Sequence, residues 1–169
     1  CPKAHKAFID WVGEKWINIY EINGYTLYPA YPFNKAIMLV GSGSNGKSTY
    51  MKFLRTMLGR ANYTSVSLQE LTDPSNRFSG SELFRKLANI DADLAQEALK
   101  ATGKFKKLTG EDELCVDRKW RDKLCFNNYA KMIFAANELP QVNDKTGAFW
   151  RRWLVIEFPN RFPIDPTFY

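Results

Sequence analysis

The sequence predicts an α/β domain of three layers, in which helices cover both faces of a parallel sheet. Residues 35–40 form a short apolar run, typical of a strand that is buried on both faces. A glycine-rich loop follows, and residues 50–58 then carry apolar side chains at helical spacing up to Gly59, a common helix stop. Further strand-like runs occur at residues 87–90 and 131–136 and in "WRRWLVIEF", with helical segments between them. This alternation is the pattern of an α/β domain.

Two other segments complete the expected order of elements. Residues 4–17 place aromatic and aliphatic side chains at helical spacing and predict one amphipathic helix. The stretch "EINGYTLYPAYP" then supplies turn signals, Asn23-Gly24 and two prolines, so we expect a loop there. The stretch "EDELCVDRKWRDKLCFNN" predicts two extended runs joined by a polar tip at residues 121–123.

Length and composition are those of an ordinary globular protein. The 169 residues suffice for one domain with a real core. No apolar run approaches the ~18 residues that a membrane helix needs, and no signal peptide opens the chain, so we expect a soluble intracellular protein without membrane contact. Because the chain starts at Cys1 rather than Met, we expect it to be a segment of a longer protein. The net charge of +6 suits a polyanionic partner but is weak evidence by itself.

Cysteine and histidine usage narrows the chemistry. Cys1, Cys115 and Cys125 are odd in number and form no CxxC pair, which argues against a disulfide framework and a zinc site. We therefore expect reduced, mostly buried thiols. His5 is the single histidine, which excludes histidine-based triads and histidine-rich metal sites.

The stretch "GSGSNGKST" at residues 41–49 matches the phosphate-binding pattern G-x-x-x-x-G-K-[ST] in full. Such a loop wraps a triphosphate with backbone N–H groups, so it needs glycine where a Cβ would collide or where φ must be positive. The following helix adds unpaired N–H groups and its positive dipole end. Lys47 can reach the β- and γ-phosphates, and the Ser48 hydroxyl can hold Mg²⁺. The predicted ATP-binding residues are Gly41, Ser42, Gly43, Ser44, Asn45, Gly46, Lys47, Ser48 and Thr49.

Three further features bear on whether ATP is hydrolysed. Asp91 and Asp93 follow an apolar segment, where they can hold Mg²⁺ or polarise water, although a simple turn pair has the same appearance. Asn137 ends the strand in "KMIFAANELP", where its amide can orient a water molecule. Arg151 and Arg152 fit either an arginine finger or a surface ion pair, and the sequence does not decide between these two.

Together, "GSGSNGKST", "KLANIDADL", "FKKLTGEDELCVDRKW", "NNYAKMIFAANELP" and "FWRRWLVIEF" resemble, in this order, the superfamily 3 helicase domain. The likeness is to the C-terminal helicase half of primase–helicase replication proteins of phages, large DNA viruses and archaeal mobile elements, over residues 36–160. The family implies an AAA+-related P-loop NTPase with a β-hairpin inserted before the sensor strand. It also implies hexameric rings that move 3′ to 5′ on single-stranded DNA.

The resemblance assigns roles to the quoted residues. Asp91 and Asp93 occupy the Walker B region, Asn137 matches the sensor asparagine, and Arg151 and Arg152 match the pair that supplies a finger to the neighbouring subunit. Two departures stand out: Ala92 separates the two aspartates, where we favour Asp93 as the base, and Glu111 replaces a more usual glycine in "LTGED". The resemblance also divides the chain into a collar-like helical segment at residues 1–35 and an ATPase core at residues 36–169.

The hairpin of this family grips DNA in the ring channel. The corresponding region here is basic around one aromatic residue, and its predicted DNA contacts are Lys106, Lys107, Arg118, Lys119, Arg121, Lys123 and Trp120. A solvated basic loop with the tryptophan packed in the core is the other interpretation.

The sequence therefore predicts the ATP-dependent motor of a DNA helicase from a virus or plasmid, with ATP and Mg²⁺ as cofactors. A nucleotide-gated DNA-binding or loading module with little turnover is the alternative. A small-molecule kinase fits less well, because no arginine cluster between Asp91 and Lys131 resembles a lid.

Overall fold

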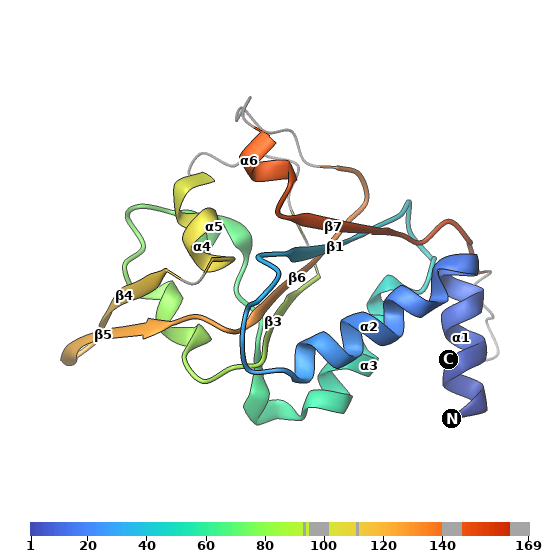
Figure 1. Cartoon of the computed structure of the whole chain (residues 1–169), viewed down its shortest axis with the longest axis horizontal. Coiled ribbons are helices and arrows are strands. Elements are labelled where there is room, and N and C mark those ends of the chain that lie inside the picture. The colour runs from blue at the N-terminus through green and yellow to red at the C-terminus, as the bar shows by residue number, and fades with distance from the viewer. Residues whose placement is uncertain (93, 95–101, 111, 140–146, 163–169) are drawn as a thin grey trace.

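The computed structural model describes residues 1–92, 94, 102–110, 112–139 and 147–162. Five parallel strands form its central sheet in the order β2-β3-β6-β1-β7. Figure 1 labels four of them, β3, β6, β1 and β7. Their bounds are Ala36–Val40 for β1, Tyr63–Thr64 for β2, Ala88–Asp91 for β3, Lys131–Ala136 for β6 and Trp153–Glu157 for β7. The predicted parallel sheet is confirmed, as are the strands expected at residues 35–40, 87–90 and 131–136.

Alternate residues of β1 point into two separate cores. Ile37 and Leu39 join a cluster built on α1 (Pro2–Val12), α2 (Trp16–Leu27) and α3 (Lys47–Leu58). Met38 joins a second cluster on the opposite face. That cluster is built on α4 (Leu68–Thr72), α5 (Thr102–Leu108), α6 (Gly147–Trp150) and the 3₁₀ turn η3 (Ser79–Leu83). Because both faces are covered, the apolar run of β1 needs no polar alternation, and the three-layer prediction is confirmed.

The N-terminal region differs from the single predicted helix. It contains α1 and α2, joined by the 3₁₀ turn η1 (Gly13–Lys15), and α2 continues through the Asn23-Gly24 pair that was expected to form a turn. Asn23 is buried, and its Oδ1 accepts a hydrogen bond from the Tyr50 hydroxyl at 3.0 Å. This tertiary contact with α3 outweighs the local turn preference of Asn-Gly.

An antiparallel hairpin stands outside the main sheet and precedes β6, as predicted (Figure 1). Its strands are β4 (Glu113–Arg118) and β5 (Arg121–Asn127). The tip is Lys119-Trp120, two residues before the predicted tip at residues 121–123. Trp120 has φ +60° and is fully exposed, so core packing of this side chain is excluded. A further 3₁₀ turn, η2 (Arg60–Asn62), leads into β2.

The prediction of reduced, mostly buried thiols is wrong for the hairpin. Cys115 and Cys125 are cross-strand partners with Cα atoms 4.1 Å apart, and they form a disulfide. Both are exposed, and Cys1 is an exposed free thiol. Directly opposed residues of a hairpin lie close together, but the sequence spacing does not reveal this until the register is known.

None of the helices in the described ranges has the length and apolar character needed to span a membrane.

Candidate nucleotide site and basic hairpin

The loop between β1 and α3 depends on glycine at two close contacts. A Cβ on Gly41 would lie 2.1 Å from Asn45 Nδ2 and 2.6 Å from the Phe158 carbonyl oxygen. Gly46 has φ +90°, and a Cβ there would lie 2.4 Å from the Trp11 ring. The loop is therefore packed closely against Asn45, Phe158 and Trp11. Gly46 is the N-cap of α3 and provides no side chain to cap the backbone N–H groups of the first turn.

Lys47 lies across the inside of this loop. Its side chain is buried, and the ammonium donates hydrogen bonds to the Gly41 carbonyl and, at 3.1 Å, to Asn45 Oδ1. Burial lowers the pKa of Lys47. A cation desolvated in this way is stabilised by an anion that approaches it, so the loop favours a phosphate ligand.

Two other strand ends reach the same edge of the sheet. Strands β1, β6 and β3 are adjacent and parallel, so their carboxyl ends lie at one edge of the sheet. Gly41 follows β1, Asn137 follows β6, and Asp91 is the last residue of β3. One cavity of about 470 Å³ is lined by Asn137, Ala92 and loop residues from Gly43 to Thr49, including Ser48. Asp91 is half-buried at the end of β3, whereas Asp93 lies outside the described residues.

The sequence interpretation missed a segment that follows β7. Phe158 accepts a hydrogen bond from Asn45 Nδ2 at 3.3 Å, and the Phe162 N–H donates to the Ser44 carbonyl at 2.7 Å. The Arg161 guanidinium donates to Ser42 Oγ at 3.2 Å from Nη2. This segment closes one side of the loop, and no pattern in "EFPNRF" marked it as part of a site.

Two aromatic residues also line the nucleotide cavity. Phe162 lines it from the segment after β7, and Trp11 lines it from α1. The Trp11 ring is held by contacts with Tyr50 and Phe158, at centroid distances of 6.0 and 6.5 Å. Helical spacing identified Trp11 as a core residue, because spacing alone does not show that the ring edge faces a cavity.

The two arginines before β7 lie at the other edge of the sheet. The Arg152 carbonyl accepts from the Ala36 N–H at 2.7 Å, and the Arg151 carbonyl accepts from the Lys35 ammonium. Because β1 has five residues that rise about 3.3 Å each, this edge is about 16 Å from the loop. The structure therefore does not bring Arg151 and Arg152 to Lys47 within one chain.

The environments of these two arginines differ. Arg151 is exposed. Arg152 is half-buried, and its Nη1 donates to the Ala148 carbonyl at 2.7 Å. The exposed Arg151 is thus better placed than Arg152 to reach outward from this surface.

The basic residues of the hairpin region fall into two groups. Four lie at or beside the tip, on both strands and the turn: Arg118, Lys119, Arg121 and Lys123. Arg118 is fixed by a hydrogen bond from its Nε to the Asp122 carbonyl at 3.1 Å. Lys106 and Lys107 lie instead on α5, whose end is tied to the hairpin base by a 2.7 Å bond from Asn128 Nδ2 to the Leu108 carbonyl. The tip therefore concentrates positive charge around the exposed Trp120 ring.

Comparison with known proteins finds one matching family and relatives in two viruses. Residues 39–152 match DUF5906, described as a family of unknown function. "Putative helicase L207/L206" of Acanthamoeba polyphaga mimivirus is 31% identical over 133 residues, which are 74% of this chain and 13% of that protein. "Putative helicase 121R" of Invertebrate iridescent virus 3 is 30% identical over 135 residues, 75% of this chain and 14% of that protein. The chain thus spans a small part of the length of these relatives.

Solved structures share the fold at low sequence identity. The A form of the apo NrS-1 C-terminal region has a TM-score of 0.69 and 17% identity, over 95% of this chain and 38% of that one. JCV helicase has a TM-score of 0.60 and 16% identity, over 95% of this chain and 46% of that one. The predicted resemblance is confirmed: the chain belongs to the DUF5906 family, and its fold is that of the superfamily 3 helicase domain.

Proposed function

We propose that this chain is the ATP-hydrolysing motor of a DNA helicase that moves 3′ to 5′ on single-stranded DNA during replication of a virus or plasmid inside its host cell. The observation that supports this most strongly is the shared sheet edge, where the glycine loop meets the ends of β3 and β6. In the order of the chain, the basic hairpin lies between these same two strands. Residues 128–130 alone separate β5 of the hairpin from β6, so the proposed polyanion contact and the nucleotide edge are linked through one strand.

The residues at this edge suit ATP and Mg²⁺. The loop has glycine where a Cβ would fill the cradle, a buried lysine, and hydroxyl and carboxylate oxygens of the kind that Mg²⁺ prefers. When bound, ATP with its metal supplies the phosphoanhydride that is hydrolysed. Ser48 and Asp91 or Asp93 would hold the metal, Lys47 would neutralise phosphate charge, and Asn137 would orient water.

We propose that Arg151 completes the site of a neighbouring subunit, because it lies about 16 Å from the loop of its own chain. Arg152, bonded to the Ala148 carbonyl, would position the segment that carries it. An arginine that acts between subunits requires an assembly, for which we propose a hexameric ring of the AAA+-related type. An arginine finger of this kind can raise the rate of hydrolysis by a factor of ~10³–10⁵.

We propose a collar-like role for residues 1–35 and an ATPase core for residues 36–169. The support is that α1 and α2 share one apolar cluster with α3, the helix that starts at Lys47. A collar packed in this way would hold the nucleotide loop of each subunit in a fixed position within the ring.

The hairpin tip would contact DNA without reading its sequence. Lys119, Arg121 and Lys123 are exposed and suited to phosphates, and the exposed Trp120 ring is suited to stacking on a base. Lys106 and Lys107, at the hairpin base, would contribute longer-range attraction.

ATP hydrolysis by the protein, with and without single-stranded DNA, tests the proposal. We expect DNA to stimulate turnover and Lys47→Ala or Arg151→Ala to abolish it. Mixing the two inactive variants in equal amounts should restore about a quarter of wild-type activity, because a quarter of the interfaces then combine an intact lysine with an intact arginine. Lys6→Ala, an exposed charge on α1, is the matched control.

Each result distinguishes the alternatives. No recovery on mixing would contradict an arginine that acts between subunits. Lys47-dependent ATP binding without turnover, in an assembled ring with DNA, would contradict the motor and favour a nucleotide-gated loading module.

A further inference from the structure

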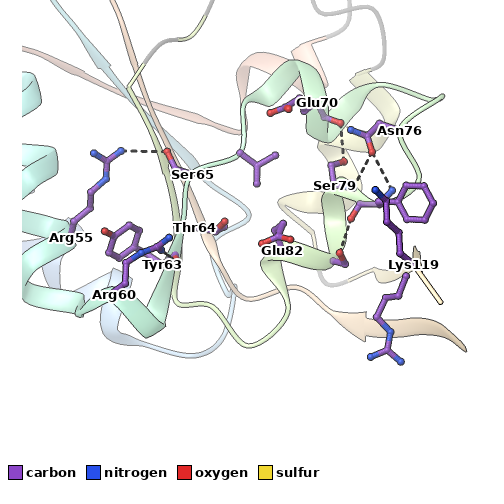
Figure 2. A pocket seen from close by; sticks show the side chains of 14 residues that line it. Arg55, Arg60, Tyr63, Thr64, Ser65, Glu70, Asn76, Ser79, Glu82 and Lys119 are labelled. Carbon is purple, nitrogen blue, oxygen red and sulfur yellow. Dashed lines mark hydrogen bonds between the residues drawn. The ribbon is translucent and has the colours of Figure 1, made fainter. Parts of the chain in front are cut away.

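A second cavity, of about 920 Å³, opens between the end of α3, strand β2 and the hairpin. None of the loop residues 41–49 lines it, so it is separate from the nucleotide cavity. Figure 2 shows Arg55, Arg60 and Tyr63 on one side of this groove and Lys119 on the other. The groove thus joins segments that are about 60 residues apart in the sequence.

Positive charge dominates the walls. Arg55 and Arg60 line one side and Arg118 and Lys119 the other, against two carboxylates, Glu70 and Glu82. The Glu70 carboxylate already accepts hydrogen bonds from Ser67, at 3.1 Å from the N–H and 2.8 Å from Oγ, as part of the cap of α4. The groove is therefore lined by four cationic side chains and two carboxylates, and one of these carboxylates is already hydrogen-bonded within the protein. This excess of positive charge favours an anionic ligand.

The arginines on the α3 side are held in place before any ligand arrives. Arg55 Nη2 donates to the Ile90 carbonyl at 2.8 Å, and the same carbonyl accepts from Ser65 Oγ at 2.8 Å. The Arg60 guanidinium lies 5.1 Å from the centroid of the Tyr63 ring. Guanidinium groups fixed in this way lose little side-chain entropy when they bind phosphate.

Aromatic and hydroxyl groups also line the groove. The Phe78 ring is 44% exposed, and its backbone N–H donates to Asn76 Oδ1 at 3.2 Å, which fixes the turn that presents it. Ser65 and Ser81 add hydroxyl groups to the same lining. A positively charged groove with an accessible ring is the arrangement that binds single-stranded nucleic acid, in which phosphates follow the cations and bases stack on the ring.

We propose that this groove binds single-stranded nucleic acid and continues the path of a strand held at the hairpin tip. The inference rests on the proposed DNA contact of the hairpin. Arg118 and Lys119 belong both to the tip and to the groove wall, so a strand at the tip enters the groove without leaving positively charged surface. Arg55 also ties the groove to the Ile90 carbonyl, one residue before Asp91 of the nucleotide edge.

Three charge-removing variants of the proposed motor test the groove. Arg60→Ala removes a groove cation, Lys119→Ala a tip cation and Lys6→Ala a distant one, and all three side chains are exposed. Binding of fluorescent oligothymidylates is measured by anisotropy over a range of salt concentrations. We expect Arg60→Ala to weaken binding of a long oligonucleotide about threefold to tenfold and to lower the salt slope by about 0.7, with Lys6→Ala unchanged.

Photo-crosslinking locates the strand directly. With oligonucleotides that carry 5-bromodeoxyuridine, we expect crosslinked peptides to contain Phe78 or Tyr63 as well as Trp120. Crosslinks confined to Trp120, or wild-type binding by Arg60→Ala while Lys119→Ala is weakened, would overturn the groove and leave the proposed function intact. Absence of any DNA binding by the wild-type protein would overturn both. Binding of polyglutamate in the groove, without DNA binding there, would overturn the proposal in favour of a protein partner.

Discussion

Replacement of Lys131 by Met should change how stability depends on pH. Lys131 is fully buried at the start of β6, and its ammonium donates to the carbonyls of Tyr28 at 2.6 Å and Tyr129 at 2.9 Å. It also lies 4.6 Å from the ring centroid of Tyr25 and 5.5 Å from that of Tyr31. Burial lowers the pKa of Lys131 to about 8, from an ordinary value of 10.5.

The sign follows from proton binding. Between pH values of about 8 and 10.5 the unfolded chain binds more protons at this lysine than the folded one, so the free energy of unfolding rises with pH. From pH 7.5 to 9.5 the full shift corresponds to a rise of about 1.8 kcal/mol. Burial raises the pKa of Tyr25, Tyr31 and Tyr50, which offsets about 0.5 kcal/mol by pH 9.5, since unfolded phenols lose protons first. With some solvent screening, we expect a net rise of about 1 kcal/mol.

Urea unfolding at pH 7.5, 8.5 and 9.5, followed by far-ultraviolet circular dichroism, measures this rise. In Lys131→Met the contribution of this lysine disappears, so the free energy of unfolding should rise less over the same range than in the wild type. The other lysines whose pKa burial lowers, Lys47 and Lys104, are present in both proteins and cancel in the comparison. Lys6→Met, an exposed lysine on α1, should behave as the wild type. Equal pH slopes for the wild type and Lys131→Met would refute the reasoning, because the lysine would then titrate at the same pH in both states.

Three further predictions concern the site and the hairpin. Gly46→Ala should weaken ATP binding, measured by calorimetry, and should lower the free energy of unfolding by about 1–3 kcal/mol, measured with urea. The reasons are that φ is +90° at this position and that the new methyl group would collide with the Trp11 ring. Wild-type values would show that the loop adapts freely. Cys125→Ser should lower the free energy of unfolding by up to about 2.7 kcal/mol, since the bond to Cys115 closes a loop of 10 residues; the difference should vanish in excess reductant. Trp120→Ala should leave stability within about 0.5 kcal/mol but weaken single-stranded DNA binding by about 1–3 kcal/mol, and unchanged anisotropy titrations would contradict base stacking.

Local sequence patterns predicted the frame of the nucleotide site. The apolar run of β1, the glycine loop and the spacing along α3 each depend on neighbouring residues, so they could be read without tertiary information. The Asn23-Gly24 turn was wrong, because a hydrogen bond from Tyr50, 27 residues away, stabilises the helix there. The cysteine prediction was wrong for a related reason, since hairpin register decided the pairing.

The sequence by itself determined the three-layer α/β class, the phosphate-binding loop and the basic, aromatic character of the hairpin, because each is written in contiguous residues with a fixed period or spacing. Tertiary structure decided which distant residues meet. In the folded chain Arg161 contacts the phosphate-binding loop, whereas Arg151 lies at the opposite edge of the sheet. Arg55 and Arg60 lie across a groove from Lys119. Strand order and register fix these encounters, and both depend on the packing of the whole chain rather than on any local stretch.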